Sequence, residues 1–243
     1  MFFSIPIFFG LSASFIWLMF YLRKDAHPES NKMVLKIFIF GMLTTIPAAL
    51  AEIGIFERIS KVWIENNPYL FIILYQLFAV ALTEEFLKYF VVKKAVLKNK
   101  EFDEPVDAMI YMIISALGFA ALENILALFG MPFINVLFIS SLRFIGATFL
   151  HALVSGTIGY FLALSIAKTK KRTSFIAAGI SISVILHALF NIFIIGIETA
   201  RIAGKTPLAV FFGVCVVIIL ISLSIFVSRG FKKLKKLSST CKI

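Results

Sequence analysis

Seven long apolar segments, separated by short polar stretches, constrain the fold of this chain more than any other feature. Each is close to the roughly 20 residues that an α-helix needs to cross the hydrocarbon core of a bilayer. Because backbone polar groups in lipid must be satisfied internally, the segments predict an all-α, polytopic bundle in the cell membrane, with residues 1–243 as one domain. The segments cover roughly 2–22, 34–56, 69–92, 106–130, 133–167, 174–197 and 207–228.

Positive charge follows the same pattern. The chain carries a formal net charge of +11, with 24 Lys and Arg residues. Of these, 18 lie in the loops near 23–36, 93–100 and 168–172 and in the tail after 228, whereas 4 lie in the alternate loops. The positive-inside rule therefore predicts an N-terminus outside the cell and a C-terminus in the cytoplasm. Clusters beside spans favour contact with anionic lipid, and no polar domain typical of nucleic-acid binding exists.

Two adjacent glutamates, Glu84 and Glu85, lie inside the third apolar segment. A carboxylate near the bilayer centre costs roughly 2.5–3.5 kcal/mol on translocon-based scales, so such residues usually serve a function. Lys88 follows at i+4 and i+3, and on a helix its side chain lies over both. A structural salt bridge explains the lysine and one glutamate. We expect the other carboxylate to be uncompensated and to share a proton, as acid–base work on water requires.

The fourth and fifth segments contain further polar residues. Glu123 and Asn124 lie among small residues, where helices can approach closely. Glu123 fits a metal ligand or base and, equally well, a packing partner for Arg143. We expect Arg143 to be structural, as the counter-charge of a glutamate. His151 stands eight residues after Arg143, about two helical turns.

The sixth segment places an imidazole and an amide on one helical face, because His187 and Asn191 are four residues apart. A single intramembrane histidine more often makes a hydrogen bond between helices, but the other polar residues on neighbouring segments favour catalysis. Counted from the segment ends, Glu84, His151 and His187 lie at similar depths near the middle of the membrane. Glu123 lies nearer the outer side by the same count.

These segments resemble the PrsW family of intramembrane proteases, relatives of the CaaX-processing protease superfamily. The resemblance covers about residues 80–195. Asp107 and Tyr111 also look like the family's residues. The CaaX-processing branch has an arginine after the glutamate pair and a histidine in place of Glu123, so the chain is more similar to PrsW. Four motifs in this order carry the resemblance: Glu84-Glu85-x-x-Lys88, Phe119-x-x-x-Glu123-Asn124, His151 with its following glycines, and His187-x-x-x-Asn191.

The resemblance implies an intramembrane peptidase that cleaves a single-pass membrane protein near or within the lipid bilayer. In bacteria with the PrsW-type pathway this substrate is an anti-sigma factor, cut first on its extracytoplasmic side. The catalytic core is then about 69–197. The implied catalytic residues are Glu84, Glu85 and His151, joined by His187 and Asn191, with Lys88, Glu123, Asn124 and Arg143 in support.

Two kinds of water activation fit these residues. With a metal ion such as Zn²⁺, Glu123, His151 and His187 would supply two nitrogens and one carboxylate and leave a position open for water. Glu84 or Glu85 would then be the base. Without a metal, one glutamate takes the proton of water, while His187 and Asn191 donate hydrogen bonds to the oxyanion. The second glutamate or His151 would then protonate the leaving amine. The lack of an HExxH helix favours the metal-free form.

Two further functions use the same residues. A proton-coupled transporter or channel also needs intramembrane Glu, His and Lys, but usually shows paired repeats and broken helices. A non-catalytic scaffold would use the polar pairs to hold helices together. A change of Glu84 to Gln distinguishes these functions from a protease, which loses activity while remaining folded.

Overall fold

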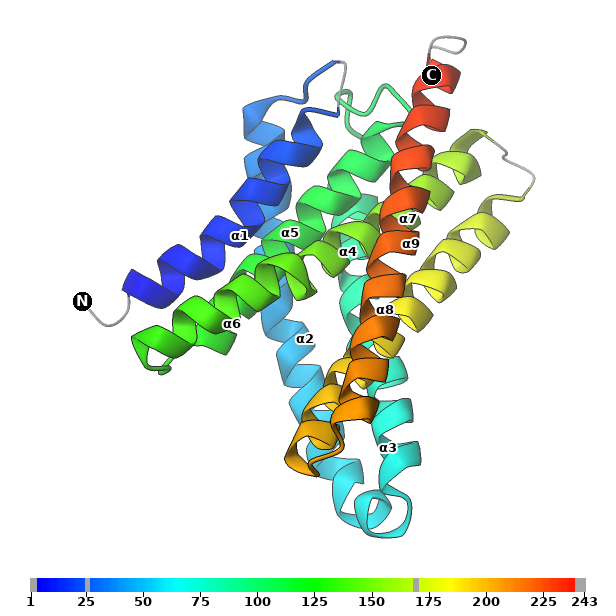
Figure 1. Cartoon of the computed structure of the whole chain (residues 1–243). Helices are drawn as coiled ribbons and strands as arrows, with labels where there is room; N and C mark the ends of the chain where they lie inside the picture. The colour runs from blue at the N-terminus through cyan, green and yellow to red at the C-terminus, as the bar shows by residue number, and fades with distance from the viewer. Residues whose placement is uncertain (1–3, 25–26, 168–170, 239–243) are drawn as a thin grey trace.

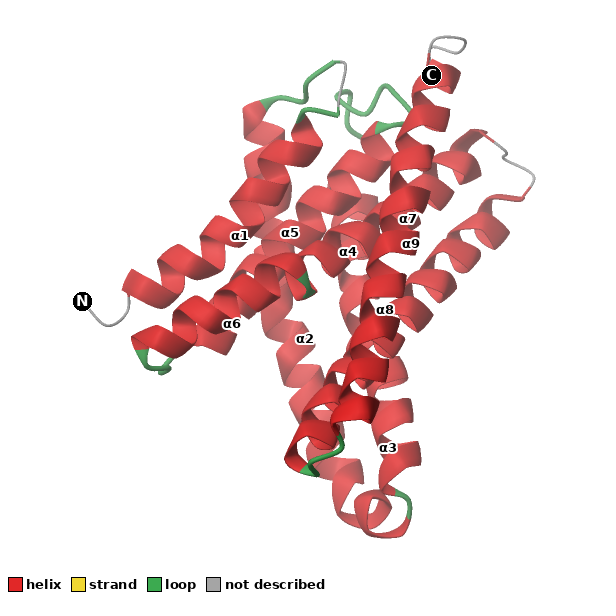
Figure 2. Cartoon of the chain, in the orientation of Figure 1, coloured by secondary structure: helices red, strands yellow, loops and turns green. Residues whose placement is uncertain are grey.

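In the computed structural model, residues 4–24, 27–167 and 171–238 are described, and the regular structure of these ranges is entirely helical (Figures 1 and 2). Lys168, Lys170 and Lys242 of the predicted basic regions lie outside these ranges. The short segment η1 is a π-helix that continues α3 into α4. In chain order the helices are α1 Ser4–Leu22, α2 Asn31–Asn66, α3 Pro68–Leu74, η1 Tyr75–Ala81, α4 Leu82–Ala95, α5 Asp107–Leu128, α6 Phe133–Ile145, α7 Ala147–Ala167, α8 Arg172–Ile202 and α9 Thr206–Ser238.

Seven stretches of the described chain are long and apolar enough to cross a membrane. They overlap all seven predicted segments, so the prediction of an all-α, multi-pass membrane protein is confirmed. The side of the membrane that each terminus faces stays a prediction. The stretches are Ser4–Leu22, Asn31–Ile59, Pro68–Ala95, Asp107–Leu128, Phe133–Ile166, Arg172–Ile202 and Thr206–Leu237.

Helix α5 is the centre of the bundle, packed against α1, α2 and α7. In its apolar window 78% of the residues are buried, against 39% or fewer in any other span. Two glycines bring α2 and α5 together: a Cβ at Gly118 would collide with the carbonyl oxygen of Phe38, and one at Gly41 with that of Ser115. Small residues at such a crossing let the backbones touch. Polar side chains on α5 are therefore held at fixed positions inside the bundle.

The fifth span is broken at Gly146. Its backbone (φ −96°, ψ −91°) ends α6, and α7 starts again at Ala147. The indole nitrogen of Trp17 on α1 donates to the carbonyl oxygen of Phe144 at 2.9 Å, next to the break. The predicted segment 133–167 is long because it contains two helices. As a result His151 lies only about one turn into α7.

The third span contains the π-helix η1 directly before the glutamate pair. Glu84 and Glu85 lie in the first turn of α4, which continues η1 without a loop. π-Helical turns are rare and occur often at functional sites, because the extra residue per turn rotates the side chains that follow. Both glutamates follow this π-helix directly, and both are buried.

Candidate active site

Four buried side chains from three helices form a compact group. Glu84 and Glu85 come from α4, His151 from α7 and His187 from α8. Each offers one carboxylate oxygen or imidazole nitrogen, and these atoms all lie within 4.8 Å of one another. Their exposed fractions are 5%, 0%, 2% and 2%, respectively. We call these four residues the Glu/His cluster.

Lys88 lies at the centre of the Glu/His cluster. Its ammonium nitrogen is 3.0 Å from Oε2 of Glu84 and 2.8 Å from Oε1 of Glu85, so the expected contact with both carboxylates is present. It is also 2.8 Å from Nδ1 of His151. A single ammonium thus lies between the two acids and bonds to each, but its one positive charge can balance only one of two ionised carboxylates, so the expectation of a second, uncompensated carboxylate stays a prediction.

The two glutamates differ in how fully they are bonded. Oε1 of Glu85 accepts from Lys88 and from Nδ1 of His187, the latter at 3.0 Å, and Oε2 accepts from the hydroxyl of Ser155 at 2.8 Å. Among the described residues, only Lys88 is hydrogen-bonded to the Glu84 carboxylate, through Oε2. Glu84 also keeps 7% of its side chain exposed, whereas Glu85 keeps none. The Glu84 carboxylate can therefore accept a hydrogen bond from one more donor, such as a water molecule.

The hydrogen bonds of His151 define its tautomer. Nε2 lies 2.8 Å from Oε2 of Glu123, and Nδ1 lies 2.8 Å from the ammonium of Lys88. An ammonium can only donate and a carboxylate only accept, so Nε2 carries the ring proton and Nδ1 is the acceptor. The ring meets that of His187 edge-on, with the centroids 5.0 Å apart.

Glu123 belongs to a second group of polar residues on the far side of His151. Nη2 of Arg143 lies 2.8 Å from Oε1 of Glu123, so the expected counter-charge is present, as a charge contact rather than an aligned hydrogen bond. Nε of Arg143 donates to Asn124 at 2.6 Å, and the Asn124 amide donates to Thr148 at 2.9 Å. Glu123 reaches His151, although the depth count placed it nearer the outer side. The break before α7 explains the difference, since it moves His151 toward that end of its span.

Asn191 lies one turn beyond His187 on α8. It is half-buried, and its amide donates to Oε1 of Gln76 on η1 at 3.1 Å. Sequence reasoning missed both Gln76 and Ser155 as neighbours of the site. A signal existed for each: Gln76 is an amide inside an apolar run, and Ser155 follows His151 at i+4, on the same helical face.

Asp107 and Tyr111 lie at the start of α5, away from the Glu/His cluster. The carboxylate of Asp107 accepts from the backbone N–H groups of Asp103 at 3.0 Å and Glu104 at 2.7 Å. The Tyr111 hydroxyl donates to Glu29. Tyr111 and Glu123 are twelve residues apart on one helix, about 18 Å along its axis. Asp107 thus holds the loop before α5, and Tyr111 ties α5 to the loop before α2.

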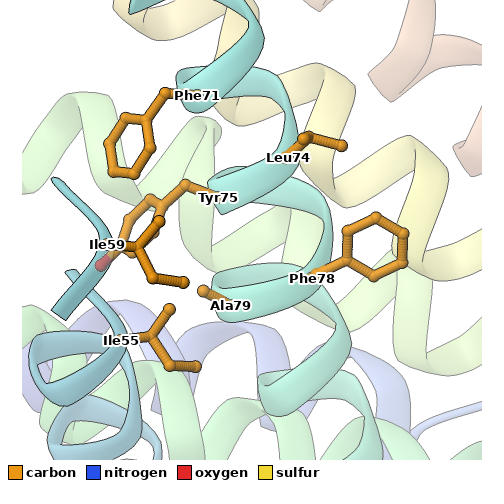
Figure 3. A pocket seen from close by; sticks show the side chains of 7 residues that line it. All are labelled: Ile55, Ile59, Phe71, Leu74, Tyr75, Phe78 and Ala79. Atoms are coloured by element: carbon orange, nitrogen blue, oxygen red, sulfur yellow. The ribbon is translucent and has the colours of Figure 1, made fainter. Parts of the chain in front are cut away.

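Two apolar pockets lie along α2. One, of about 240 Å³, is formed between α2 and the α3–η1 segment (Figure 3). The other, of about 400 Å³, lies between Pro47 and Ala51 of α2 and the start of α4, where Thr83 contributes to its wall. Neither contains a residue of the Glu/His cluster, but Thr83 precedes Glu84 directly. The first pocket is lined by Ile55, Ile59, Phe71, Leu74, Tyr75, Phe78 and Ala79.

Comparison with known proteins assigns the chain. A family model described as PrsW family intramembrane metalloprotease matches residues 29–223. The chain belongs to the PrsW family. Protease PrsW of Geobacillus kaustophilus (strain HTA426) is 31% identical over 172 residues, which cover 71% of each chain. Protease PrsW of Oceanobacillus iheyensis is 26% identical over 190 residues, covering 78% of this chain and 83% of the relative. That of Clostridioides difficile (strain 630) is 28% identical over 204 residues, covering 80% and 77%. No solved structure matches the chain significantly.

Membership of the PrsW family makes this protein an intramembrane protease of the cell membrane. It decides against the proton-coupled transporter and the scaffold. The family description also names a metal, and the oxygen and nitrogen donors of the Glu/His cluster could hold a metal ion. In the present geometry the ammonium of Lys88 bonds to the donors that such an ion would need, so ion and ammonium exclude each other.

Glu123 contacts the Glu/His cluster from outside, on the side of the His151 ring that faces away from Lys88. It contacts Nε2 of His151, whereas Nδ1 of the same ring faces Lys88. A ligand set of Glu123, His151 and His187 stays a prediction, as does zinc as the metal. Carboxylates that bond to the far nitrogen of a histidine orient the ring and raise its basicity.

Proposed function

We propose that this PrsW family member hydrolyses a peptide bond of a single-pass membrane protein with a water molecule activated by Glu84. The observation that carries the proposal is the buried Glu/His cluster, whose ligand-type atoms lie within 4.8 Å of one another. Burying acids and imidazoles together inside an apolar bundle costs free energy. Ionisable groups found inside a membrane therefore usually serve a function. The catalytic core proposed is about 69–197, since every residue with a role lies within it.

Glu84 is the proposed base. One of its carboxylate oxygens is held by Lys88 and the other has capacity to accept from water. A proton moves from water to Glu84 as the water oxygen attacks the carbonyl carbon, and the same proton passes to the leaving nitrogen when the C–N bond breaks. Glu85 is the proposed anchor, because Lys88, His187 and Ser155 occupy its two oxygens.

His187 and Asn191 are the proposed donors to the oxyanion of the tetrahedral intermediate. They lie one turn apart on α8. The Asn191 amide uses one N–H for Gln76 and has a second to offer. His187 donates through Nδ1 to Glu85, so donation by this ring needs a proton on Nε2 as well. Donors held in place within a low-dielectric site stabilise developing negative charge strongly.

His151 is the proposed positioning residue between the two polar groups. It accepts from Lys88 and donates to Glu123, which in turn contacts Arg143. A metal ion, if it replaced the Lys88 ammonium among the Glu/His cluster, would be held by Glu84, Glu85, His151 and His187 and would supply Lewis-acid activation of water.

The proposed substrate is a single-pass membrane protein, with an anti-sigma factor as the specific candidate. The resemblance to the PrsW pathway supports cleavage on the extracytoplasmic side as the first step. The apolar pocket beside Thr83 supports a membrane-embedded partner, because its surface suits an apolar helix better than a soluble peptide.

Co-reconstitution with a panel of single-pass membrane proteins, anti-sigma factors included, tests the function. Wild type is compared with Glu84→Gln and Glu85→Gln, each with and without a strong chelator. Glu198→Gln serves as a matched control, because Glu198 is an exposed acid on the apolar helix α8, away from the site. Fragments separated by electrophoresis and identified by mass spectrometry report cleavage.

We expect wild type and Glu198→Gln to cleave the substrate, both with and without chelator. We expect Glu84→Gln to cleave nothing. Loss of cleavage with chelator and its return with zinc would replace the metal-free mechanism by a metal-assisted one. Full activity of a folded Glu84→Gln protein would refute the assignment of the base.

A further inference from the structure

We propose that the ammonium of Lys88 is the resident cation of the Glu/His cluster, in the position that a metal ion would take, and that zinc binds there only when Lys88 is replaced. The inference deepens the proposed function and rests on it for the catalytic meaning of the site. Its geometric part stands on the side chains alone.

All three N–H groups of the Lys88 ammonium are used inside the Glu/His cluster. They point to Oε2 of Glu84 at 3.0 Å, Oε1 of Glu85 at 2.8 Å and Nδ1 of His151 at 2.8 Å. The side chain is fully buried, and the ammonium lies 4.1 Å from the ring centre of Phe119. An ammonium has three donors and no acceptor, so its hydrogen bonding is complete. Cation–π attraction to Phe119 holds the remaining side.

The three partners of the Lys88 ammonium are atoms of the kind that bind metal ions. Two carboxylate oxygens and one imidazole nitrogen suit zinc, which takes such ligands at about 2.0–2.2 Å. Nδ1 of His151 lies 3.8 Å from the Glu84 oxygen and 4.0 Å from the Glu85 oxygen that Lys88 contacts. An ion at bonding distance from all three would therefore overlap with the ammonium. The cluster holds one of the two cations at a time.

The two cations reach the Glu/His cluster in different ways. Lys88 is on the same helix as both glutamates, at i+4 and i+3, so the fold itself delivers its charge. A metal ion would have to displace a buried ammonium and leave it without its anionic partners, which is strongly unfavourable. The ammonium of Lys88 therefore occupies the Glu/His cluster in preference to a metal ion. It holds the Glu84 carboxylate in a fixed orientation for catalysis.

The test is a zinc titration of the whole purified protein in lipid nanodiscs, read by bound zinc per chain and by the melting temperature. Wild type is compared with Lys88→Met, which keeps an unbranched apolar side chain like the lysine stem and removes the ammonium group. Lys93→Met is the matched control, since Lys93 is on the same helix but exposed. We expect one zinc per chain and a raised melting temperature in Lys88→Met only, because a ligand that binds the native state stabilises it. Both effects should vanish when His151→Ala is added.

Two outcomes would overturn the proposal. One is stoichiometric zinc in wild type that is lost in Glu84→Gln or His151→Ala, and the other is a folded Lys88→Met protein that takes up no zinc. If Lys88→Met does not fold even with zinc, the variant Lys88→Met/Glu84→Gln keeps Glu85, His151 and His187, a His₂Glu set that suits zinc, and must bind it. The titration needs no substrate, so its failure is separate from a failure to detect proteolysis.

Discussion

The ammonium of Lys88 lies 2.8 Å from Nδ1 of His151, two residues that are 63 positions apart in the chain. This contact makes Nδ1 a hydrogen-bond acceptor, so the ring proton is on Nε2. From Nε2 the ring donates a hydrogen bond to the Glu123 carboxylate. Two hydrogen bonds through the His151 ring on α7 thus join the charged group on α4 to the polar group on α5 and α6.

The two glutamates should respond differently to neutral replacement. Glu84→Gln should lower the cleavage rate by about 10²–10⁴-fold, the range that general acid–base groups contribute, with little change in stability. Glu85→Gln should also destabilise the protein, by about 3–5 kcal/mol, because it weakens a fully buried ion pair. Rates in nanodiscs and thermal unfolding in the same preparation measure both effects. Equal losses of stability in the two variants would contradict the division between base and anchor.

Replacement of Glu123 should act through His151. Glu123→Ala removes the acceptor at Nε2 and should lower the cleavage rate by about 10–100-fold, the usual cost of losing such an orienting carboxylate. Glu123→Gln keeps an acceptor and should lose less. Steady-state cleavage rates of both variants, with Glu198→Gln as control, show which of the two loses more activity. Equal losses in the Gln and Ala variants would argue that Glu123 provides its charge rather than an acceptor that orients His151.

Asn191 and Gln76 should show a graded effect on catalysis. Asn191→Ala removes the proposed oxyanion donor and should reduce kcat by about 10²–10³-fold, as oxyanion donors do elsewhere. Gln76→Ala keeps Asn191 and removes only the side chain that accepts its hydrogen bond at 3.1 Å, so kcat should fall less. The effect of each on kcat and on KM is measured with one cleavable substrate. A loss confined to KM in both variants would assign the pair to substrate binding.

The crossing of α2 and α5 should not tolerate a larger residue. Gly118→Ala places a Cβ against the backbone of Phe38, which cannot move as a flexible side chain does, and overpacking of this kind costs about 1–3 kcal/mol. Gly213→Ala on α9 meets nothing within 4 Å and should be neutral or slightly stabilising. Melting temperatures in one detergent compare the two. Equal melting temperatures would show that the helices separate at little cost.

Much of the fold could be predicted because hydropathy is local. A run of apolar residues determines a span wherever its neighbours lie, so all seven segments are present as helices. The contact of Lys88 with Glu84 and Glu85 was predictable for the same reason, since i+3 and i+4 spacing on one helix sets it. The depth of Glu123 relative to His151 was not, because counting along the chain assumes a straight helix and the fifth span is broken at Gly146.

What the sequence determined by itself is therefore the number of spans, the identity of the polar residues inside them and their spacing within each helix. Only the tertiary structure decided that Ser155 and His187 bond to Glu85, that Gln76 meets Asn191, and that Lys88 rather than Glu123 faces Nδ1 of His151. These contacts join different helices, and their geometry depends on crossing positions, on the break at Gly146 and on the π-helix η1. Such features arise from packing between residues far apart in the chain, which no local pattern contains.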